Sequence, residues 1–571
     1  MPTTLDFDVA IIGGGPAGAT AGGFLKKYKP DLKVGIFERE VFPRDHIGES
    51  QLPPICRILD ELGCWEKVEA ANFPIKVGGT YRWGRSPELW HLEFVPFEEF
   101  KDEARPGKFQ GQRLRTAFQV DRSLYDEILL DHAAELGCEV HEGAKVLKVG
   151  RQGDRVTDLQ LEDGTGITAR HYIDASGSSG ILRRAMGVDC DYPSTLQNIA
   201  IWEYWQNAEW AVKIGIGGTR IQVLSVPYGW IWFIPLGPTR TSIGLVIPAA
   251  HFKASGKKPA ELYRQALAEE SIVAALTKNA TSEGKLYTTK DWSFLAQRQS
   301  GENWFLAGET AGFADPILSA GMTMAHMAGR EVAFTIMELD RGKLAADWLK
   351  EEFGRRQSAR VITHIRFADY WYTANTQFKE LKEFTAELAE NAGLDLDPAR
   401  AWAWIGQGGF IDEDATSGTG GFSLALVKGL GDFLTELDAG SPLQENNVFE
   451  LDLRGATWKD RAGYRLGAVE KEACYVRGNR MLPVVNAIQF GVNLLQLEKT
   501  ASGIIRRMRA SVAQSPNDAA LMGLVEGFPQ VLEAMILDGW VKASNDPSQP
   551  PFVSKQSHRE LRWEHDINPK S

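Results

Sequence analysis

The sequence predicts an α/β protein with a Rossmann-type fold at its N-terminus, an inserted layer of antiparallel sheet, and a mainly helical C-terminal region. Three observations support this class. Near the start of the chain, a short apolar run ends at a glycine-rich turn that leads into a helical pattern. Aromatic and β-branched runs split by Gly and Pro occupy about 195–290, and helical patterning dominates after Gly321.

These patterns divide the chain into three predicted parts. Residues 1–350 form the main α/β domain, with the antiparallel layer of about 195–290 inserted on its substrate side. Residues 351–480 form a helical region that packs on this domain. Residues 481–571 form a C-terminal module reminiscent of winged-helix domains, with helices over 494–511 and 527–539 followed by Trp540-Val541-Lys542-Ala543.

The composition is that of a globular protein, since 43% of the 571 residues are hydrophobic and 24% are charged. Five cysteines without a C-x-x-C pair and ten histidines without ligand spacing predict neither a disulfide framework nor a metal site. A net charge of −12 argues against nucleic acid as a partner. The start has no signal-peptide pattern, and no uninterrupted apolar stretch approaches the roughly 20 residues that cross a bilayer. We therefore expect a cytoplasmic chain without a membrane span.

Residues 8–38 have the pattern of one βαβ unit, with a strand over 8–12, a helix from about 17 to 28 and a second strand over 33–38. The turn Gly13-Gly14-Gly15-Pro16-Ala17-Gly18 has G-x-G-x-x-G spacing. Its first glycine permits the tight turn, its second lets the backbone approach a pyrophosphate, and its third lets helix and strand pack closely. Glu38 lies 20 residues beyond Gly18, where a carboxylate can accept hydrogen bonds from ribose hydroxyls. The unit predicts a dinucleotide site that includes Gly13, Gly15, Pro16, Ala17, Gly18 and Glu38.

Three later segments favour FAD over NAD. Gln119–Arg122, Asp174–Gly177 and Leu306–Pro316 resemble, in order and spacing, the FAD-contacting segments of the single-component flavoprotein hydroxylase superfamily. The resemblance implies flavin contacts from Gln119, Arg122, Asp174, Gly308, Glu309 and Pro316. That superfamily usually has Gly-Asp where this chain has Gly308-Glu309, so Glu309 is expected to hold the ribityl chain with a longer reach.

The chain shows no separate nicotinamide site. A second glycine-rich stretch, Ser417–Gly421, follows an acidic loop rather than a strand, and therefore predicts a loop. We expect the reducing equivalents to arrive as reduced flavin, FADH2, from a partner flavin reductase.

Further motifs, within residues 13–321, resemble the flavin-dependent halogenases. Phe42-Pro43-Arg44 and Gly48–Pro53 are similar to the strap that lies along the flavin in that family, which implies flavin contacts from Arg44, Gly48, Glu49 and Ser50. The segment 73–84 resembles the one that carries the family's essential lysine, here Lys76. Residues 230–235 match W-x-W-x-I-P, and residues 313–321 match F-x-x-P-x-x-S-x-G at the halide site, here Ser319, Ala320 and Gly321.

This resemblance implies an enzyme that uses FADH2, O2 and chloride or bromide to form hypohalous acid at the flavin. Small residues at 319–321, before a helix that begins near Met322, can present backbone N–H groups to a halide. Trp230 and Trp232 fill space next to the flavin, so an organic substrate cannot reach it and be hydroxylated. Lys76, as a buried amine, directs the oxidant onto the substrate by hydrogen bonding or by forming a chloramine. The alternatives are that the tryptophan pair is ordinary core packing and that Lys76 is a surface lysine before glycines.

Leu318 occupies the position at which tryptophan halogenases carry a glutamate that helps to orient the indole. The sequence therefore disfavours free tryptophan as the substrate. The C-terminal region resembles instead the halogenases that act on phenols, pyrroles, carrier-protein-tethered substrates or activated alkyl carbons, including the chloramphenicol-pathway enzyme, and this implies secondary metabolism. Asp291 is expected near the edge of the flavin ring, either as a hydrogen-bonding or structural residue or as the site of an ester to the flavin.

Two other functions remain open. The first is an FAD-dependent monooxygenase or a geranylgeranyl-reductase-like oxidoreductase on the same fold, in which Lys76 is incidental and the products do not depend on halide. The second is a non-catalytic flavoprotein whose module at 481–571 docks a partner.

Overall fold

The computed structural model describes residues 5–83, 87–194, 196–373, 442–478, 480–550, 552 and 561–563. The chain forms two compact units, the first made of residues 1–365, 464–469 and 562–571, and the second of 366–463 and 470–561. The predicted loop at Ser417–Gly421, and with it the stretch 374–441 of the predicted helical region, lies outside the described residues.

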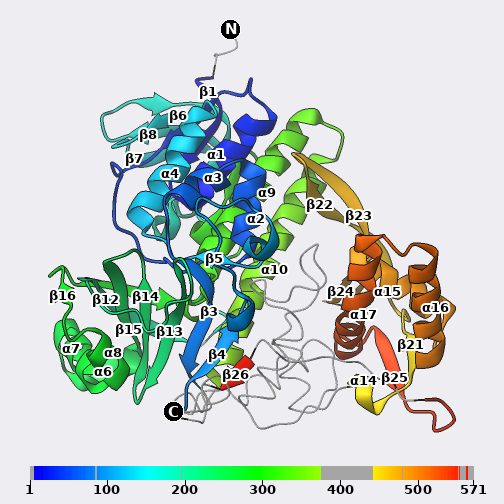
Figure 1. Ribbon diagram of the computed structural model, residues 1–571. Coiled ribbons are helices and arrows are strands. Elements are labelled where there is room, and N and C mark those ends of the chain that lie inside the picture. The colour runs from blue at the N-terminus through cyan, green and yellow to red at the C-terminus, as the bar shows by residue number, and fades with distance from the viewer. Residues whose placement is uncertain are drawn as a thin grey trace. The chain divides into compact units, whose positions relative to one another are not determined.

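A parallel five-stranded sheet is the centre of the first unit. Its order is β19 (Trp304–Leu306), β10 (Ala169–Asp174), β1 (Phe7–Ile12), β2 (Val34–Phe37) and β6 (Glu139–His141). Helix α1 (Pro16–Tyr28) packs against α4 (Arg122–Glu135) and α9 (Gly321–Arg341) beside this sheet (Figure 1). Strands β1 and β2 are buried almost throughout, as expected for parallel strands covered on both faces. The predicted βαβ unit is confirmed.

A ten-stranded sheet forms the other layer of the described first unit. Its main path is β16 (Thr281–Ser282), β12 (Gln197–Gln206), β15 (Arg240–Pro248), β14 (Gly229–Pro235), β13 (Gly218–Val226), β3 (Ile75–Arg82), β4 (Trp90–Glu93) and β26 (Leu561–Trp563), with β17 (Tyr287–Trp292) paired to β12 and β5 (Ala117–Phe118) to β3. The antiparallel layer predicted for about 195–290 is present. The structure extends it, because β3 joins β13 as a parallel neighbour from a distant part of the chain.

The two faces of this sheet have different partners. One face presents Ile231, Phe233, Ile243 and Leu245 to a core shared with helices α6 (Ala249–Ser255), α7 (Pro259–Glu269) and α8 (Ser271–Leu276), which Figure 1 shows together at the β12 side of the sheet. The opposite face carries Trp230 and Trp232, because side chains alternate along β14.

A β-bulge decides which face Lys76 joins. Lys76 is directly opposite Thr219, and Gly79 is opposite Ile221, so three steps along β3 match two steps along β13. Residues directly opposite each other in neighbouring strands project to the same face of the sheet. Side chains also alternate between the faces along β13, so Thr219, Ile221 and Val223 share one face. Val223 is in turn opposite Trp232. The extra residue in β3 therefore places Lys76 on the face of the tryptophan pair.

Smaller elements complete the first unit. They are α2 (Pro54–Leu62), α3 (Trp65–Ala70), α5 (Ile181–Ala185), α10 (Ala346–Thr373, which runs into the second unit), the sheet of β7 (Val146–Gln152), β8 (Arg155–Leu161) and β9 (Gly166–Ile167), and the sheet of β11 (Cys190–Asp191), β18 (Phe294–Ala296) and β20 (Gly312–Phe313).

The second unit has its own apolar core. Its described elements are α14 (Pro442–Glu445), β21 (Val448–Leu451), β22 (Thr457–Arg465), β23 (Ala468–Arg477), β24 (Arg480–Pro483), α15 (Asn486–Leu497), α16 (Ala501–Gln514), α17 (Ala519–Leu537) and β25 (Val541–Ser544). Strand β21 pairs with β25, and the core extends from Leu443 to Phe552. The cluster thus begins before the predicted boundary at 481, and residues 448–483 are strands rather than helices. Its relation to the winged-helix fold stays a prediction.

The helix predicted over 494–511 is two helices. The predicted helix is interrupted at Thr500, whose side chain accepts a hydrogen bond from the Gly503 N–H and caps the N-terminus of α16. The carbonyl of Lys499 accepts from the Phe449 N–H, so the junction is also bound to β21.

Helix α17 alone, among the described helices, is long and apolar enough to cross a membrane, with a mean hydropathy of 1.4. Phe528, Val531, Leu532 and Met535 of this helix are buried in the core of the second unit. Packing in this core accounts for the buried share of the helix, which is 39% of its most apolar stretch.

Candidate active site

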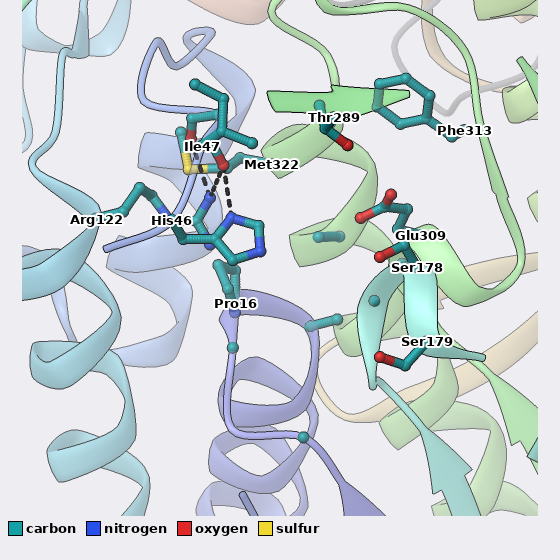
Figure 2. A pocket seen from close by; sticks show the side chains of 18 of the residues that line it. Pro16, His46, Ile47, Arg122, Ser178, Ser179, Thr289, Glu309, Phe313 and Met322 are labelled. Carbon is teal, nitrogen blue, oxygen red and sulfur yellow. Dashed lines mark hydrogen bonds between the residues drawn. The ribbon is translucent and has the colours of Figure 1, made fainter. Parts of the chain in front are cut away.

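A cavity of about 1010 Å³ is lined by residues of both sheets of the first unit. Figure 2 shows Pro16 at the start of α1, with His46 and Arg122 to one side and Glu309 and Ser178 across from them. The predicted site residues in its wall are Gly13, Gly15, Pro16, Ala17, Glu38, Arg44, Gly48, Glu49, Ser50, Arg122, Trp230, Trp232, Gly308, Glu309, Pro316, Ser319, Ala320 and Gly321. Segments far apart in the sequence therefore meet around one space. Gly18, Gln119, Asp174 and Lys76 are outside this wall.

The glycine turn has two kinds of glycine. A side chain at Gly13, whose φ is +102°, would collide with the Ala175 carbonyl, and one at Gly18 would collide with the Gly13 carbonyl. At Gly15 the nearest atom to an added Cβ is Arg44 Nη2, at 3.6 Å. Gly13 and Gly18 thus serve the turn and its packing, which explains why Gly18 is outside the wall, while Gly15 presents its backbone to the cavity.

Glu38 and the start of α1 form the polar side of this turn. The Glu38 carboxylate accepts hydrogen bonds from the Gly14 N–H at 2.7 Å and the Glu40 N–H at 2.9 Å. Helix α1 has Pro16 in its first turn and no side-chain cap, so its remaining N-terminal N–H groups are available to an anion.

The strap of residues 42–53 is fixed to α4 by Arg122. This guanidinium forms a bidentate pair with Asp126, at 2.7 and 2.8 Å, and donates to the carbonyls of Ile47 at 2.8 Å and Gly48 at 3.1 Å. Arg44 Nη1 lies 3.0 Å from the same Asp126 carboxylate. Asp126 was not predicted from the sequence, although its i+4 spacing from Arg122 on the amphipathic segment that forms α4 could have indicated the pair.

The strap is also fixed to the ten-stranded sheet. Arg240 lies 2.9 Å from Asp45 and 2.8 Å from Asp121, and the Tyr204 hydroxyl donates to Glu49 at 3.0 Å. Sequence reasoning missed Arg240 and Tyr204, because no local pattern links residues that become neighbours only through sheet pairing.

Glu49 is a buried carboxyl group in the cavity wall. Burial raises its pKa to about 7, although the Tyr204 hydroxyl and Arg122 both favour the ionised form. The cavity therefore contains an acid that titrates near neutral pH.

Gln119 and Asp174, which the sequence predicts to contact the flavin, do not line this cavity. The Asp174 carboxylate accepts hydrogen bonds from the Ser176 hydroxyl at 2.6 Å and the Leu182 N–H at 2.7 Å, so it holds the turn after β10. Residues 175–179 of that turn line the cavity instead. With the Gln119 amide oriented so that its nitrogen and its oxygen both have partners, the nitrogen donates to the Pro235 carbonyl at 3.0 Å and the oxygen accepts from the Ile221 N–H at 3.2 Å.

Glu309 is half-buried in the wall, directly after Gly308, whose φ is +69°. Burial raises the pKa of its carboxyl group, and the positive charge of Arg122 opposes this shift. The Asp291 backbone pairs with Asn198, and its side chain lies outside the described structure.

Trp230 and Trp232 are both buried and both line the cavity. The Trp232 indole N–H donates to the Ser242 hydroxyl at 3.1 Å. Gly244 is directly opposite Trp232 in β15, and a side chain there would collide with the indole ring. These contacts hold the Trp232 ring in one place in the wall.

The turn before α9 contains the residues that the sequence predicts to bind the halide. The Asp315 carboxylate accepts from the Ile317 N–H at 2.9 Å, and Ser319 has a left-handed φ of +54°. Ala320 precedes the 21-residue helix α9 without a side-chain hydrogen bond that would cap it. The first N–H groups of α9 therefore begin at the cavity wall, where they are available to an anion.

Lys76 is 3% exposed, so the alternative of a surface lysine is wrong. Its Nζ donates to the Gln51 carbonyl at 2.9 Å and lies 5.5 Å from the centre of the Phe94 ring. Burial lowers its pKa to about 7. An amine with this pKa is largely uncharged just above neutral pH, and it can then act as a nucleophile.

The residues of the cavity fit FAD. The volume is large enough for a dinucleotide, the Gly15 backbone faces it and the start of α1 is open to a phosphate. Glu38 lines the cavity directly after β2, where a dinucleotide fold carries its ribose-binding carboxylate. Among the described residues, no group of three or more His, Cys, Asp or Glu side chains is arranged to hold a metal ion.

A family model described as tryptophan halogenase matches this chain over residues 8–109 and 98–381. The chain is 31% identical to a tryptophan 2-halogenase of Chondromyces crocatus, over 68% of this chain and 72% of that protein. It is 30% identical to a 1H-pyrrole-2-carbonyl-[peptidyl-carrier protein] chlorinase of Pseudomonas fluorescens, over 58% of this chain and 76% of that protein.

Solved structures give the same result. The flavin-dependent halogenase CmlS is similar with a TM-score of 0.72 and 25% identity, over 98% of this chain and 99% of that one. The chondrochloren halogenase CndH, described as FAD-dependent, is similar with a TM-score of 0.58 and 27% identity, over 75% of this chain and 97% of that one.

Proposed function

Because this chain belongs to the flavin-dependent halogenases, enzymes that use FAD, a halide and oxygen, we propose that it passes hypohalous acid through Lys76 to an electron-rich aromatic or carrier-bound substrate. The observation that carries this proposal is the burial of Lys76 on the sheet face that carries the tryptophan pair, where burial lowers its pKa to about 7.

Different residues of the protein bind the flavin, bind the halide and keep the organic substrate away from the flavin. Gly13, Gly15 and Glu38 bind the dinucleotide part of FAD, and Ser319–Gly321 offer N–H groups to chloride or bromide. When bound, reduced FAD together with oxygen supplies the oxidising equivalents that convert the halide to hypohalous acid. Trp230 and Trp232 block the way of an organic substrate to the flavin, so that only the small oxidant moves on.

Lys76 then receives the oxidant. As an ammonium it can donate hydrogen bonds to hypohalous acid, and as a free amine it can accept the halogen. Both routes fix the position from which the halogen is transferred, and burial excludes the water that would disperse it.

For the substrate we propose a phenol, a pyrrole or a carrier-tethered group of secondary metabolism. The similarity to the carrier-protein chlorinase supports a tethered substrate, and Leu318 argues against free tryptophan even though one similar protein is named a tryptophan 2-halogenase. A flavin reductase that shares the cytoplasm with this enzyme is the proposed source of FADH2.

One assay tests the function. The chain is incubated with FAD, a flavin reductase, NADH, oxygen and bromide or chloride, together with a panel of electron-rich arenes, and the products are identified by mass. We expect at least one product with the halide isotope pattern. Products that form without halide would favour a monooxygenase, and FAD binding without any product would favour a non-catalytic flavoprotein.

The variant Lys76→Ala separates halogen transfer from flavin binding. It is expected to bind FAD, as measured by quenching of flavin fluorescence, and to lose halogenation by a factor of more than about 100, since a positioned catalytic group contributes that much or more. A variant that halogenates at the wild-type rate would show that the transfer does not pass through Lys76.

A further inference from the structure

Two methionine side chains line the cavity beside the turn that is predicted to bind the halide. Met322 and Met324 follow Ser319–Gly321 closely in the chain and belong to the first turn of α9. Both are part of the cavity wall, and Figure 2 shows Met322 among the side chains that line it. Neither flavin binding nor the proposed transfer through Lys76 gives these two thioethers a role.

A thioether is a reactive group in a cavity of this kind. Hypohalous acid oxidises methionine to methionine sulfoxide, which turns a flexible apolar side chain into a polar one. The cavity wall also contains a thiol, Cys190, but burial raises its pKa, and this disfavours the thiolate form that reacts with oxidants. Met322 and Met324 are therefore the side chains of the wall that we expect this oxidant to modify first.

Burial separates these two methionines from oxidants in bulk solution. Met322 is 5% and Met324 is 7% exposed, whereas Met522 of α17 is 38% exposed. Met327, further along α9, is half-buried and is not part of the cavity wall. An oxidant in bulk water reaches Met522 first, whereas an oxidant that forms in the cavity reaches Met322 and Met324 first. The position of the sulfoxide therefore reports where the oxidant arises.

We propose that Met322 and Met324 are modification sites of this enzyme, oxidised to methionine sulfoxide by hypohalous acid that forms in the cavity and is not consumed by halogenation. This inference rests on the proposed function, which supplies the oxidant. Halogenation through Lys76 and oxidation of the two thioethers compete for the same hypohalous acid. The modification should therefore be greatest when no organic substrate is present.

The oxidation balances with hypohalous acid as its single oxidant. A sulfur lone pair attacks the halogen, a sulfur–halogen bond forms, and the halogen–oxygen bond breaks with its electron pair, which leaves as hydroxide. Hydroxide then attacks the sulfur, and the halogen leaves as halide with the electron pair of the sulfur–halogen bond. Loss of the hydroxyl proton gives the sulfoxide. The sulfur loses two electrons, the halogen gains two, and the products are sulfoxide, halide and one proton.

The modification should lower the rate of halogenation. Each sulfoxide places a polar sulfur–oxygen group in the first turn of α9, beside the backbone N–H groups that are predicted to hold the halide. The sulfoxide oxygen is a hydrogen-bond acceptor and can compete with the halide for these donors. We therefore expect the oxidised enzyme to need more bromide for the same rate and to lose activity as the sulfoxide accumulates.

Turnover without an organic substrate tests the modification. The holoenzyme is incubated with a flavin reductase, NADH, oxygen and bromide, with catalase to remove hydrogen peroxide and free methionine to consume oxidant in bulk solution. Trypsin then releases residues 299–330 as one peptide, in which tandem mass spectrometry locates each added oxygen. We expect about tenfold more sulfoxide at Met322 and Met324 than at Met327 and Met522, and no such excess when bromide is omitted.

Three variants give further readouts. Lys76→Ala removes the competing reaction, so the sulfoxide formed at Met322 and Met324 per NADH should rise severalfold. The double variant Met322→Leu, Met324→Leu is a volume-conserving exchange that protein cores tolerate, and it should brominate an arene for more turnovers than the wild type before activity is lost. The matched control Met508→Leu, Met535→Leu makes the same exchange at buried positions of the second unit and should lose activity as the wild type does.

The outcomes separate this inference from the proposed function. Bromide-dependent sulfoxide concentrated at Met322 and Met324 supports the modification, even if no arene in the panel is brominated. If the wild type brominates an arene but these two methionines gain no more oxygen than Met327 and Met522, the modification is wrong and the proposed function stands. If neither bromination nor bromide-dependent sulfoxide is found, both proposals fail.

Discussion

The burial of Lys76 has a cost in folding free energy that can be measured without substrate or flavin. Its pKa falls from 10.5 to about 7 because burial disfavours the ammonium form. Between these two values the unfolded chain binds more protons than the folded one, so stability rises with pH across this window. At about 1.36 kcal/mol per pKa unit, the penalty is roughly 5 kcal/mol below pH 7 and vanishes above about pH 10.5.

The variant Lys76→Met removes this charge and keeps a side chain of similar length. It also leaves the Gln51 carbonyl without its donor, which costs about 1–3 kcal/mol. We therefore expect the variant to be more stable than the wild type by about 2–4 kcal/mol at pH 6, with the gain shrinking to nothing or reversing by about pH 10.

Urea unfolding of the flavin-free protein at pH 6, 7.5 and 9 measures this difference. Lys148→Met, at an exposed position of β7, is the control and should show no such pH dependence. A variant no more stable than the wild type at pH 6, or a gain that is the same at pH 9, would refute the argument that Lys76 is held in the protein at a cost to stability.

The other predictions concern the cavity wall. Glu49→Gln should leave the free energy of unfolding unchanged at pH 4 and raise it at pH 8 by up to about 3 kcal/mol. The pKa of Glu49 is raised to about 7, so its carboxyl group stabilises the fold at low pH and loses that contribution as pH rises through 7. Urea unfolding at both pH values checks the sign. Asp126→Ala removes the carboxylate that pairs with the buried Arg122 and with Arg44. We expect the free energy of unfolding to fall by about 3 kcal/mol and FAD to bind more weakly in a fluorescence titration. An FAD affinity equal to that of the wild type would contradict the role of the strap. Gly244→Ala should displace the Trp232 indole and reduce halogenation, with near-UV circular dichroism reporting the ring movement; an unchanged spectrum with full activity would show that the ring position is not critical. Acid precipitation tests an ester between Asp291 and the flavin, which requires yellow colour in the pellet; colour left wholly in the supernatant excludes it.

Much of the cofactor site is local in sequence and was therefore predictable. The strand–glycine turn–helix at 8–28, the carboxylate of Glu38 and the turn before α9 each depend on neighbouring residues, whose spacing fixes the backbone conformation. The same is true of Asp121, which caps α4 by accepting from the Ser123 N–H. The family motifs are likewise short stretches of neighbouring residues, so they indicated a halogenase from the sequence alone.

Whether a side chain is buried, and to which face of a sheet it projects, depends on pairing between segments far apart in the sequence. No local sequence pattern contains this information. The bulge in β3 turns Lys76 toward the tryptophan pair, and only the register with β13 reveals it. Arg240 reaches the strap through the sheet, and the second unit begins before 481 because β21 pairs with β25. The sequence by itself indicated the groups that we propose to bind the flavin and to take part in the reaction. Tertiary structure decided which of them are buried together, and hence that the pKa of Lys76 is lowered to about 7, because desolvation is a property of packing.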